Sequence, residues 1–522
     1  MLLAFLLPAL AMAHNFKVDG IYYNINGNEA TVTFKGSYYY SFDNEYSGSV
    51  VIPATVTYNG TTYPVTSIDD YAFHSCIGLT SIVIPNSVTS IGYWTFAFCE
   101  SLTSMDIPKS VTKIGEDAFY STAWYNNQPD GLVYAGLVAY KYKGTMPSGT
   151  SMTLKEGTAG ITGSAFECCS GLTSIVIPNS VTDIGSGTFA HCTGLTSVNI
   201  PNTVTVIRGN TFYDCTALTS IVIPNSVDSI AGEAFCCTGL TSIFIPNSVT
   251  RIDHKAFAIC PGVTSIVVES GNPRYDSHND CNAIIETASN TLIVGCKNTI
   301  IPNSVTEIGD YAFDGCRGLT GIVIPNSVTA IDFMAFYGCS GLTSIDIPNS
   351  VTKIGIQAFG KCTGLTSIVI PNSMTEIDDH AFNGCYGLTD VYCYIADLSR
   401  VSSGNEQFHV YNGDYSGRTL HVLQGTADDY RADENLYPYF GQIVEDIFMG
   451  DVNGDLEINM DDVTALIDIL LSGETALQTA DCDQDGSINI NDVTTLINYL
   501  LSLNQHVVIP AFPATVSTSK AM

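Results

Sequence analysis

Hydrophobic and polar residues alternate in a pattern that recurs every 23 residues through most of the chain. The clearest copy, Ile324 to Asp346, reads I-P-N-S-V-T-A-I-D-F-M-A-F-Y-G-C-S-G-L-T-S-I-D. Internal repetition with a fixed period of about 20 to 50 residues is typical of stacked architectures. The pattern therefore predicts a solenoid, mainly β, in which each copy forms one coil.

Each copy predicts short extended segments joined by corners. Residues 319–324 alternate between apolar and small or outward-facing side chains, as in a half-buried strand. Pro325 has no N–H to donate, so it ends the strand and starts a turn. A second short extended segment follows, and Phe336 and Cys339 return the chain to the interior. Because one coil cannot bury its apolar side alone, successive coils must stack.

A phenylalanine marks about twelve copies of the repeat, at Phe73, Phe96, Phe119, Phe166, Phe189, Phe212, Phe235, Phe257, Phe313, Phe336, Phe359 and Phe382. Ten of the 17 cysteines follow this phenylalanine by three residues: Cys76, Cys99, Cys169, Cys192, Cys215, Cys260, Cys316, Cys339, Cys362 and Cys385. Stacked coils hold such side chains parallel instead of face to face, so we expect a row of buried thiols. Disulfide bonds are the alternative, and the adjacent pairs at 168–169 and 236–237, together with Cys281 and Cys296, stay open.

The residue two positions before each repeat proline is expected to face outward on the strands. The apolar members of this series that we select as a candidate binding face are Val83, Val176, Val222, Phe244, Val323 and Val369. A long exposed apolar stripe marks an interaction surface. Its chemistry changes little from coil to coil, which favours avidity for extended or repetitive ligands over one small-molecule pocket. The alternative is that these strands pack against a second layer or a second copy of the chain.

The pattern L-x-x-I-x-I-P-x-S-V-x-x-I-x-x-x-A-F-x-x-C resembles the BspA-like leucine-rich repeat of bacterial surface proteins over roughly residues 50–395. This resemblance implies a parallel-stranded leucine-rich solenoid. It also implies an adhesin-type binding role toward host matrix proteins or other cell surfaces, and it implies no catalytic chemistry.

Other segments flank or interrupt the repeats. The apolar stretch 1–13 ends in Ala11-Met12-Ala13 and is interpreted as a secretory signal peptide, although no Lys or Arg precedes its apolar run. The remaining organisation that we predict is an N-terminal β cap at 14–58, a solenoid at 59–395 with inserts at 123–163 and 269–298, a C-terminal cap at 396–446, a calcium-binding module at 447–503 and a tail at 504–522. We expect a secreted or bacterial cell-surface protein with no membrane-inserted segment.

Charge narrows the choice of partners. The chain has 51 acidic and 19 basic residues, which give a formal net charge of −32. Such a balance repels phosphate backbones and anionic lipids, so we expect neither nucleic acid nor membrane surfaces as partners. Acidic residues gather between Glu445 and Asp492, where a cation is the natural ligand.

Two twelve-residue loops in this acidic region, D-V-N-G-D-L-E-I-N-M-D-D and D-C-D-Q-D-G-S-I-N-I-N-D, are each followed by an apolar helical segment. Oxygen ligands at loop positions 1, 3, 5, 7 and 12 are how proteins surround calcium, with a backbone carbonyl at position 7. The sequence therefore predicts two calcium ions, the first held by Asp451, Asn453, Asp455, Glu457 and Asp462, the second by Asp481, Asp483, Asp485, Ser487 and Asp492.

The duplicated loop and helix resemble a type I dockerin repeat, a family that docks onto a cohesin partner. Two departures from the family pattern affect what the resemblance implies. Leu456 occupies loop position 6, where glycine takes a left-handed turn, so we expect the first site to be weaker by about 1 to 2 kcal/mol. The positions that resemble the partner-recognition spot are Met460-Asp461 and Ile490-Asn491 instead of small hydroxyl residues. The residues match the calcium-ligand pattern better than they match the partner-recognition pattern. Calcium binding is therefore the main expectation for this module, and a cohesin-like partner is the second.

The sequence shows no phosphate-binding loop, zinc-protease, nucleophile-elbow or dinucleotide motif, which favours a non-enzymatic function. The first hypothesis is an adhesin-like protein that binds a protein or glycan. The second is a non-catalytic component of an extracellular polysaccharide-handling complex, attached through the dockerin-like pair. An enzyme would need an active site in an insert, for example at Asp276 and Asp280.

Overall fold

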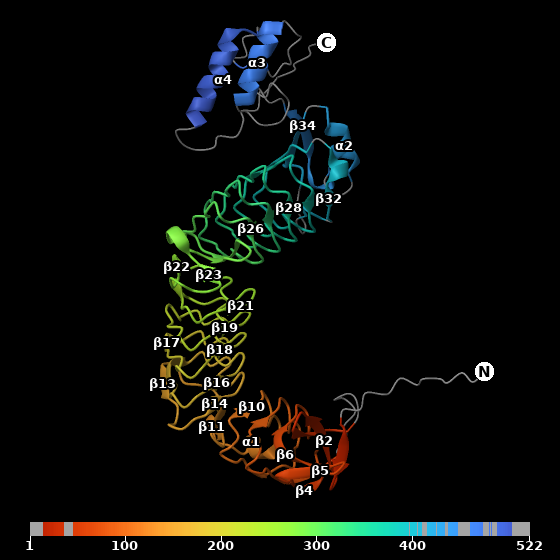
Figure 1. The fold of residues 1–522 in the computed structure, drawn as a ribbon, viewed down its shortest axis with the longest axis vertical. Helices are drawn as coiled ribbons and strands as arrows, with labels where there is room; N and C mark the ends of the chain where they lie inside the picture. The colour runs from red at the N-terminus through yellow and green to blue at the C-terminus, as the bar shows by residue number, and fades with distance from the viewer. Residues whose placement is uncertain are drawn as a thin grey trace, which may run out of the picture. The chain divides into compact units, whose positions relative to one another are not determined.

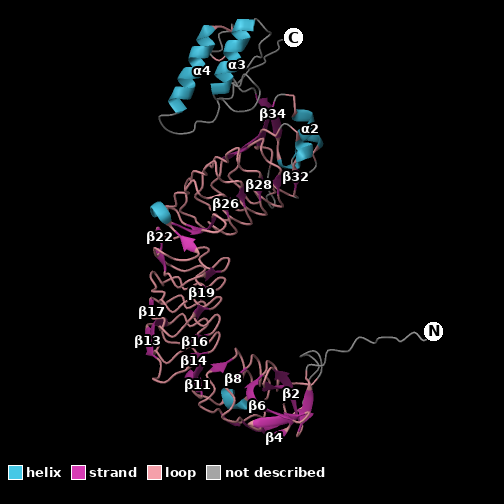
Figure 2. Ribbon diagram, in the orientation of Figure 1, coloured by secondary structure: helices cyan, strands magenta, loops and turns pink. Residues whose placement is uncertain are grey.

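The structure is a computed structural model that describes residues 14–35, 45–395, 397–404, 406–409, 415–423, 425–433, 437–446, 460–472, 480, 482 and 488–503. The chain divides into two compact units, the first formed by residues 1–288 with 293–298 and the second by residues 289–292 with 299–522. Each unit is mainly a β solenoid with few helices, as the colouring in Figure 2 shows. The predicted fold class is confirmed, with about 16 turns and a period near 23 residues.

The first unit starts with antiparallel strands and continues as two parallel ladders. The antiparallel strands are β1 (Phe16–Val18), β2 (Ile21–Asn26) and β3 (Glu29–Thr33), with β5 (Thr55–Tyr58) paired to β6 (Thr61–Ile68). The long strands form three parallel sheets, which together we call the long ladder: β4 (Gly48–Val51), β7 (Leu79–Val83) and β9 (Ser104–Asp106); β13 (Thr150–Thr153), β15 (Leu172–Val176) and β17 (Ser197–Val198); and β20 (Ser242–Ile245) with β22 (Ser265–Val268). The short ladder contains β8 (Ser90–Ile91), β10 (Lys113–Ile114), β14 (Gly160–Ile161), β16 (Asp183–Ile184), β18 (Val206–Ile207), β19 (Ser229–Ile230) and β21 (Arg251–Ile252). In Figure 1, β13 and β17 follow one side of this unit and β16, β18 and β19 follow the other.

The second unit repeats the same plan. Its short ladder contains β26 (Glu307–Ile308), β27 (Ala330–Ile331), β28 (Lys353–Ile354), β30 (Glu376–Ile377) and β32 (Ser402–Ser403). Its long ladder contains β29 (Ser367–Ile370), β31 (Asp390–Cys393), β33 (Thr419–Leu423) and β34 (Gln442–Asp446). The helical elements are η3 (Leu398–Arg400), α2 (Ala427–Ala432), η4 (Tyr437–Tyr439), α3 (Met460–Ser472) and α4 (Ile490–Leu503).

Stacked phenylalanine rings form the centre of both units. Rings of successive coils lie nearly parallel, with centroids 5.5 Å apart between Phe166 and Phe189 and 5.2 Å apart between Phe336 and Phe359. Because each coil places the same ring over the one before, the apolar face of every coil is covered by its neighbours.

The cysteines that follow these phenylalanines are free thiols in the structure. The Cys339 thiol donates a hydrogen bond to the Phe313 carbonyl at 3.1 Å, and Cys362 does the same to Phe336 at 3.1 Å. Each such bond satisfies a carbonyl in the preceding coil. Burial raises the pKa of Cys215 to about 12, so this thiol stays protonated at neutral pH.

Rings outside the twelve copies that the sequence marks also join the stack, so the stack is longer than the sequence period indicated. Tyr46 packs on Phe73 with ring centroids 4.6 Å apart, and Tyr140 packs on Phe119 at 5.0 Å. In the second unit, Phe408 extends the stack beyond Phe382 at 4.9 Å. Strands β4, β33 and β34 lie in the long ladder although they fall within the segments that the sequence assigned to caps.

Both inserts return the chain to its neighbouring coils. The first holds α1 (Ala123–Asn126) and the hairpin β11 (Gly131–Ala135) to β12 (Val138–Lys143). The second holds β23 (Tyr275–Asp276), η2 (His278–Asp280), β24 (Ala283–Glu286) and β25 (Thr291–Gly295).

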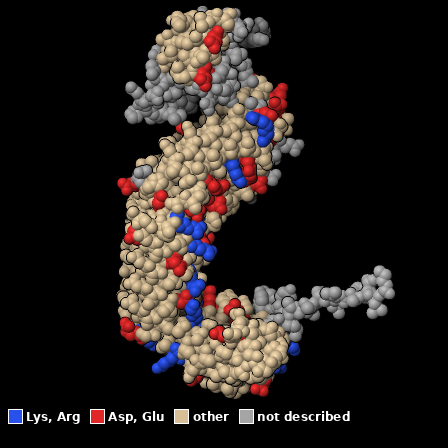
Figure 3. Space-filling model, viewed as in Figure 1, with Lys and Arg blue, Asp and Glu red and all other residues tan. Residues whose placement is uncertain are grey.

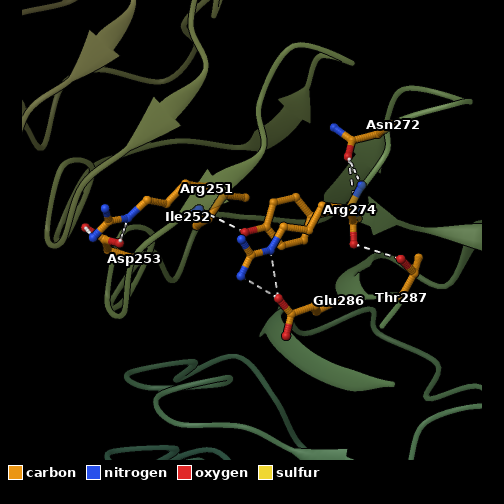
Figure 4. A network of polar contacts seen from close by, with 8 residues as sticks. Arg251, Ile252, Asp253, Asn272, Arg274, Glu286 and Thr287 are labelled. Atoms are coloured by element: carbon orange, nitrogen blue, oxygen red, sulfur yellow. Dashed lines mark hydrogen bonds and ion pairs between the residues drawn. The ribbon is translucent and has the colours of Figure 1, made fainter. Parts of the chain in front are cut away.

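Figure 4 shows how the second insert is fastened to β21. The amide of Ile252 donates to the Tyr275 hydroxyl at 2.9 Å, and Arg274 forms an ion pair with Glu286 at 2.8 Å. Asn272 Oδ1 accepts from the backbone amides of Arg274 and Tyr275 at 2.9 Å each. These contacts give the insert a structural role in closing one coil on the next.

Among the described residues, no helix has the length and apolar character needed to cross a bilayer. Residues 1–13, interpreted above as a signal peptide, lie outside the described part of the chain.

Candidate binding surface

The outward side of the long ladder carries a row of apolar residues, which we call the apolar row. In the first unit its members are Val51, Val83, Val176, Val222, Phe244 and Val267, and in the second unit Ile300, Val323 and Val369. Parallel register places them over one another: Val51 pairs with Val83, and Phe244 pairs with Val267. Alternation along each strand sends the neighbouring isoleucines inward, where Ile82 and Ile243 are buried.

Five of the six residues selected from the sequence are strongly exposed. Val222 is 80% exposed and Val323 is 83% exposed, and Val83, Val176 and Phe244 are about half exposed. Val369 is half-buried beside Tyr392, its partner in the next strand. The structure thus places the selected residues outward, in two separate sets, one on each unit.

Sequence reasoning missed other members of the row. Val51 lies in the segment assigned to the cap, yet it begins the same Val-Ile-Pro triplet as Val83, which was the available signal. Val267 was missed because Glu269 stands where the repeat proline is expected.

Hydroxyl-bearing rows flank the apolar row. Serines at equivalent strand positions lie in register, and Ser151 and Ser174 approach each other at 2.6 Å between Oγ atoms. Threonine hydroxyls donate to the backbone of the preceding coil, as Thr196 does to the Thr173 carbonyl at 2.9 Å. The long ladder therefore presents methyl and hydroxyl groups over most of its coils, interrupted at the row position by Asp106 and Asp346, which lie in register with Val83 and Val323.

Charged residues are concentrated elsewhere on the coils. Over the face drawn in Figure 3, charged atoms are sparse, and several basic side chains adjoin acidic ones. Arg208 pairs with Asp183 at 2.7 Å, and Lys255 pairs with Glu233 at 3.6 Å. These pairs reduce the positive charge that an anionic ligand would need.

Near its end, before Val444 of β34, the long ladder of the second unit carries an aromatic segment that sequence reasoning missed. Tyr392 and His421 occupy the row position on successive strands, and their rings stack with centroids 4.3 Å apart. His421 Nε2 lies 3.4 Å from Asp390 Oδ1. The repeat pattern has faded here, so only the register of the ladder shows that these residues continue the row.

The described part of the metal loops consists mainly of their last ligands. Asp462 and Asp492 occupy loop position 12, in the first turns of α3 and α4, and both side chains are fully buried. A backbone amide at Asn489 donates to Asp492 Oδ2 at 2.7 Å. Buried carboxylates in this position fit a hard cation. Asp451, Asn453, Asp455, Glu457, Asp481, Asp483, Asp485 and Ser487 lie outside the described residues.

The two helices pack through a small apolar core made of Val463, Leu466, Ala480, Val493 and Leu496. Their outer surfaces keep Met460 62% exposed and Ile490 67% exposed, at equivalent positions of the two loops. These are the residues that the sequence placed at the partner-recognition spot.

Comparison with known proteins gives the family of these repeats. The model of the BspA type leucine-rich repeat region matches in six copies, at residues 37–129, 150–282 and 292–403, which is well over half of the chain. The model of the dockerin type I domain matches residues 449–501. No protein in the curated comparison matches the chain.

Solved structures with similar folds come from bacterial leucine-rich repeat proteins. A leucine-rich cell surface protein from Faecalibacterium prausnitzii is 28% identical, with 77% of this chain and 96% of that chain covered and a TM-score of 0.42. A leucine-rich repeat protein from Bacteroides ovatus is 25% identical, with coverages of 83% and 100% and a TM-score of 0.37. The pneumococcal vaccine antigen PcpA is 18% identical, with coverages of 84% and 99% and a TM-score of 0.41.

Proposed function

We infer that this chain, which belongs to the BspA-type leucine-rich repeat proteins and carries a type I dockerin domain, is a non-catalytic binding protein that holds extended ligands along the apolar row. Proteins of this family are extracellular or lie at the cell surface. We assign it an adhesin-like role toward a protein or glycan, after export directed by residues 1–13.

The observation that supports this proposal most directly is the exposure of the apolar row. Val222 and Val323 each present more than three quarters of their surface to solvent, within coils whose inward positions are fully buried. Exposed apolar surface lowers the free energy of a complex when a partner covers it. Because the same groups recur on successive coils, many weak contacts add along an extended ligand.

Substitution within one unit gives a direct test. Val323→Asp places a charge in the middle of the row, whereas Ile356→Asp places one at another exposed apolar side chain, 40% exposed, outside the row. The full chain is applied to immobilised matrix proteins and to immobilised glycans. We expect Val323→Asp to weaken capture about tenfold or more and Ile356→Asp to leave it unchanged. Equal effects of the two substitutions would contradict binding through the row.

A second candidate function follows from the dockerin domain. Dockerin domains interact with cohesin partners. On this basis the chain is a non-catalytic component of an extracellular polysaccharide-handling complex, attached by its C-terminal module. The exposed Met460 and Ile490 give this module an apolar recognition spot, so its partner would present an apolar complement.

The dockerin domain also carries the proposal of two bound calcium ions. Type I dockerin domains bind calcium. We assign the first ion to Asp451, Asn453, Asp455, Glu457 and Asp462, and the second to Asp481, Asp483, Asp485, Ser487 and Asp492. When bound, the ions neutralise the carboxylates that the two helices bury.

Attachment and ligand binding can be tested separately. A cohesin-bearing partner should be retained by the full chain in calcium and released by chelator. Met460→Asp combined with Ile490→Asp should abolish this retention, with no effect on capture through the apolar row. Retention that resists both the double substitution and chelator would exclude the dockerin domain as the attachment site.

A further inference from the structure

A cluster of aromatic rings lies on the first unit, away from the apolar row, at the corner between the short strand and the next long strand. We call it the aromatic corner, and its members are Tyr71, His74, Tyr93, Trp94, Phe98 and Tyr120. They come from three successive coils. Backbone hydrogen bonds hold the corners in register: Tyr71 N donates to the Tyr93 carbonyl at 2.9 Å, and Phe98 N donates to the Tyr120 carbonyl at 2.8 Å.

The six rings form one continuous set of contacts. Trp94 lies at the centre, with ring centroids 5.9 Å from His74, 5.8 Å from Phe98 and 5.7 Å from Tyr120. Tyr71 and Tyr93 meet edge to face at 5.7 Å, which joins them to the same cluster. The rings are therefore packed against one another and offer a preformed surface.

Folding of the coil does not require aromatic residues at these positions. The position two before the core phenylalanine, which is Trp94 here, is Ser164, Gly187, Asn210 or Glu233 in other coils of the same unit. Its backbone is left-handed, with φ of 52° at Trp94, and Phe98 has φ of 61°. A bulky side chain is costly in this conformation compared with glycine or asparagine. Because non-aromatic residues fill this position in those coils, and Lys255 fills it in another, the coil forms without a ring there, so the aromatic residues point to a role outside folding.

The cluster remains open to solvent. Tyr93 is 36% exposed and Tyr120 is 43% exposed, while the other four rings are half-buried. A surface made only for packing would leave less ring area in contact with water.

Its electrostatic surroundings are acidic. Glu116 lies in the next coil, where its carbonyl accepts a hydrogen bond from the Trp94 amide at 3.1 Å, and burial together with the charges of Glu116, Asp117 and Asp70 raises the pKa of Tyr93. Asp70 also accepts a 2.6 Å hydrogen bond from the Tyr93 amide. Lys141 pairs with Asp117 at 2.7 Å, so the net charge beside the rings comes from Asp70 and Glu116.

The histidine in the cluster does not oppose this negative field. Burial lowers the pKa of His74 below its usual value, so its ring is uncharged at neutral pH. The surface then combines the electron-rich faces of aromatic rings with nearby carboxylates. Both attract a cation, and the carboxylates repel a polyanion.

We propose that the aromatic corner is a second binding site, which takes arginine or lysine side chains from a basic segment of a partner protein. A cation over the exposed tyrosine rings gains cation–π stabilisation, and Asp70 and Glu116 supply the balancing charge. The chain's net charge of −32 increases the local concentration of such a segment at low salt.

The chain supplies its own reporter for this site. It contains two tryptophans, Trp94 and Trp124, so Trp124→Phe leaves Trp94 as the single fluorophore. This variant of the full chain is titrated with a decapeptide that carries four arginines separated by serines. A second peptide replaces each arginine by citrulline, which keeps the shape and removes the charge. A neutral gluco-oligosaccharide forms the third arm.

We expect saturable change of the Trp94 emission with the arginine peptide, and at least tenfold weaker binding of the citrulline peptide. Raising the salt from 50 to 300 mM should weaken the arginine complex about threefold or more. Tyr93→Leu and Tyr120→Leu should each weaken it about two- to fivefold. Asp70→Asn combined with Glu116→Gln should weaken it further. Circular dichroism verifies that each variant is folded.

Tyr386→Leu is the matched control, because Tyr386 is a 62% exposed aromatic residue in the other unit. It should leave the titration unchanged. Equal binding of the arginine and citrulline peptides, or a response to the oligosaccharide alone, would overturn the proposal. The Val323→Asp variant should bind the arginine peptide normally, so failure here is separable from failure of the apolar row.

Discussion

Single residues in left-handed backbone conformation recur at two positions in every repeat coil, two before and two after the core phenylalanine. In the second unit the later position is Gly315, Gly338 and Gly384 in three coils, with φ between 67° and 75°. Lys361 occupies it in the fourth, with φ of 58°. The conformation is set by the coil and not by the side chain, so the strain depends on which residue occupies the position.

Replacing glycine at this position should therefore lower the stability, and introducing glycine there should raise it. A Cβ at Gly338 would meet only ordinary contacts, the nearest at 3.7 Å from Gly315 Cα, so Gly338→Ala tests backbone strain alone. We expect it to lower the free energy of unfolding by about 1 kcal/mol. Lys361→Gly should raise it by about 0.5 kcal/mol, because relief of strain exceeds the loss of the contact between Lys361 and the Tyr337 ring. Urea denaturation followed by circular dichroism measures both, and a neutral Gly338→Ala would contradict this account.

Asp332 gives the stability of the second unit a pH dependence. Burial raises its pKa to about 7, and a hydrogen bond to Glu307 together with the Glu307 charge acts in the same direction. The folded state thus binds this proton more tightly than the unfolded state. Stability due to this group increases as the pH falls from about 7 toward 4 and is lost as the pH rises through 7. We expect Asp332→Asn to reduce the difference in melting temperature between pH 5 and pH 8.

The control for Asp332→Asn is a variant in which an exposed acid is neutralised. Glu156 is exposed on the first unit, and Glu156→Gln should leave the difference between the two pH values unchanged. If the melting temperature of Asp332→Asn changed between pH 5 and pH 8 as much as that of the unsubstituted chain, other carboxyl groups would determine the pH dependence.

At the scale of secondary-structure elements, the sequence predicts coils wherever its pattern is regular and misses them where a tyrosine replaces the phenylalanine or the surrounding pattern has diverged. The copies from Phe313 to Phe382 follow the period without a break, and they stack as expected. Tyr46, Tyr140 and Phe408 fill the same place in coils whose other positions have diverged. Only packing reveals them, since the stack accepts any ring of similar area.

The apolar row and the aromatic corner also differ in how far the sequence predicts them. Strand alternation predicts the apolar row, because its period of two residues determines which side chains point outward. The aromatic corner could not be predicted from local pattern. Trp94 and Tyr120 are neighbours only after coils stack, and the residue type at the recurring left-handed positions varies from coil to coil, so the repeat does not indicate an aromatic cluster.

A buried arginine ends the row of thiols in the second unit. The Arg418 guanidinium donates to the carbonyls of Cys385 and Phe408 at 2.8 Å each and of Leu388 at 3.0 Å, and burial lowers its pKa. This element therefore depends on one side chain for three hydrogen bonds.

We expect Arg418→Met to lower the free energy of unfolding of the second unit by about 3 kcal/mol or more, because three buried carbonyls lose their donor. Arg418→Lys should lower the free energy of unfolding by less than Arg418→Met does. It should still be destabilising, because an ammonium group cannot reproduce the planar fork of donors. Differential scanning calorimetry measures the shift. Arg400→Met removes an exposed arginine and serves as the control, and a shift for Arg418→Met no larger than for this control would contradict the role assigned to Arg418.

Across the whole molecule, the accessibility of thiols should report how completely the coils are stacked. The structure has 17 free cysteines, of which Cys168 is exposed and Cys237 and Cys482 are partly exposed. Burial raises the pKa of Cys385 to about 12, which leaves very little reactive thiolate at pH 8. We expect iodoacetamide to modify Cys168 first in the native protein and the core cysteines only after unfolding. Peptide mass mapping identifies the sites, and a mass deficit of two hydrogens per cysteine pair would instead reveal disulfides.

Removal of calcium should affect one part of the molecule and spare the rest. Without a cation, the fully buried carboxylates of Asp462 and Asp492 lose the charge that offsets their burial, so α3 and α4 should unfold on chelation. Solenoid coils contact only their neighbours, so their thermal transition should persist unchanged. We expect chelator to remove helical circular dichroism and leave the main melting transition in place. Asp492→Ala should mimic chelation at the second loop, and Asp468→Ala, at an exposed acid on α3, should not. If chelation removed both the helical circular dichroism and the main melting transition, the stability of the repeats would depend on the metal. That outcome would contradict the mode of stacking described here.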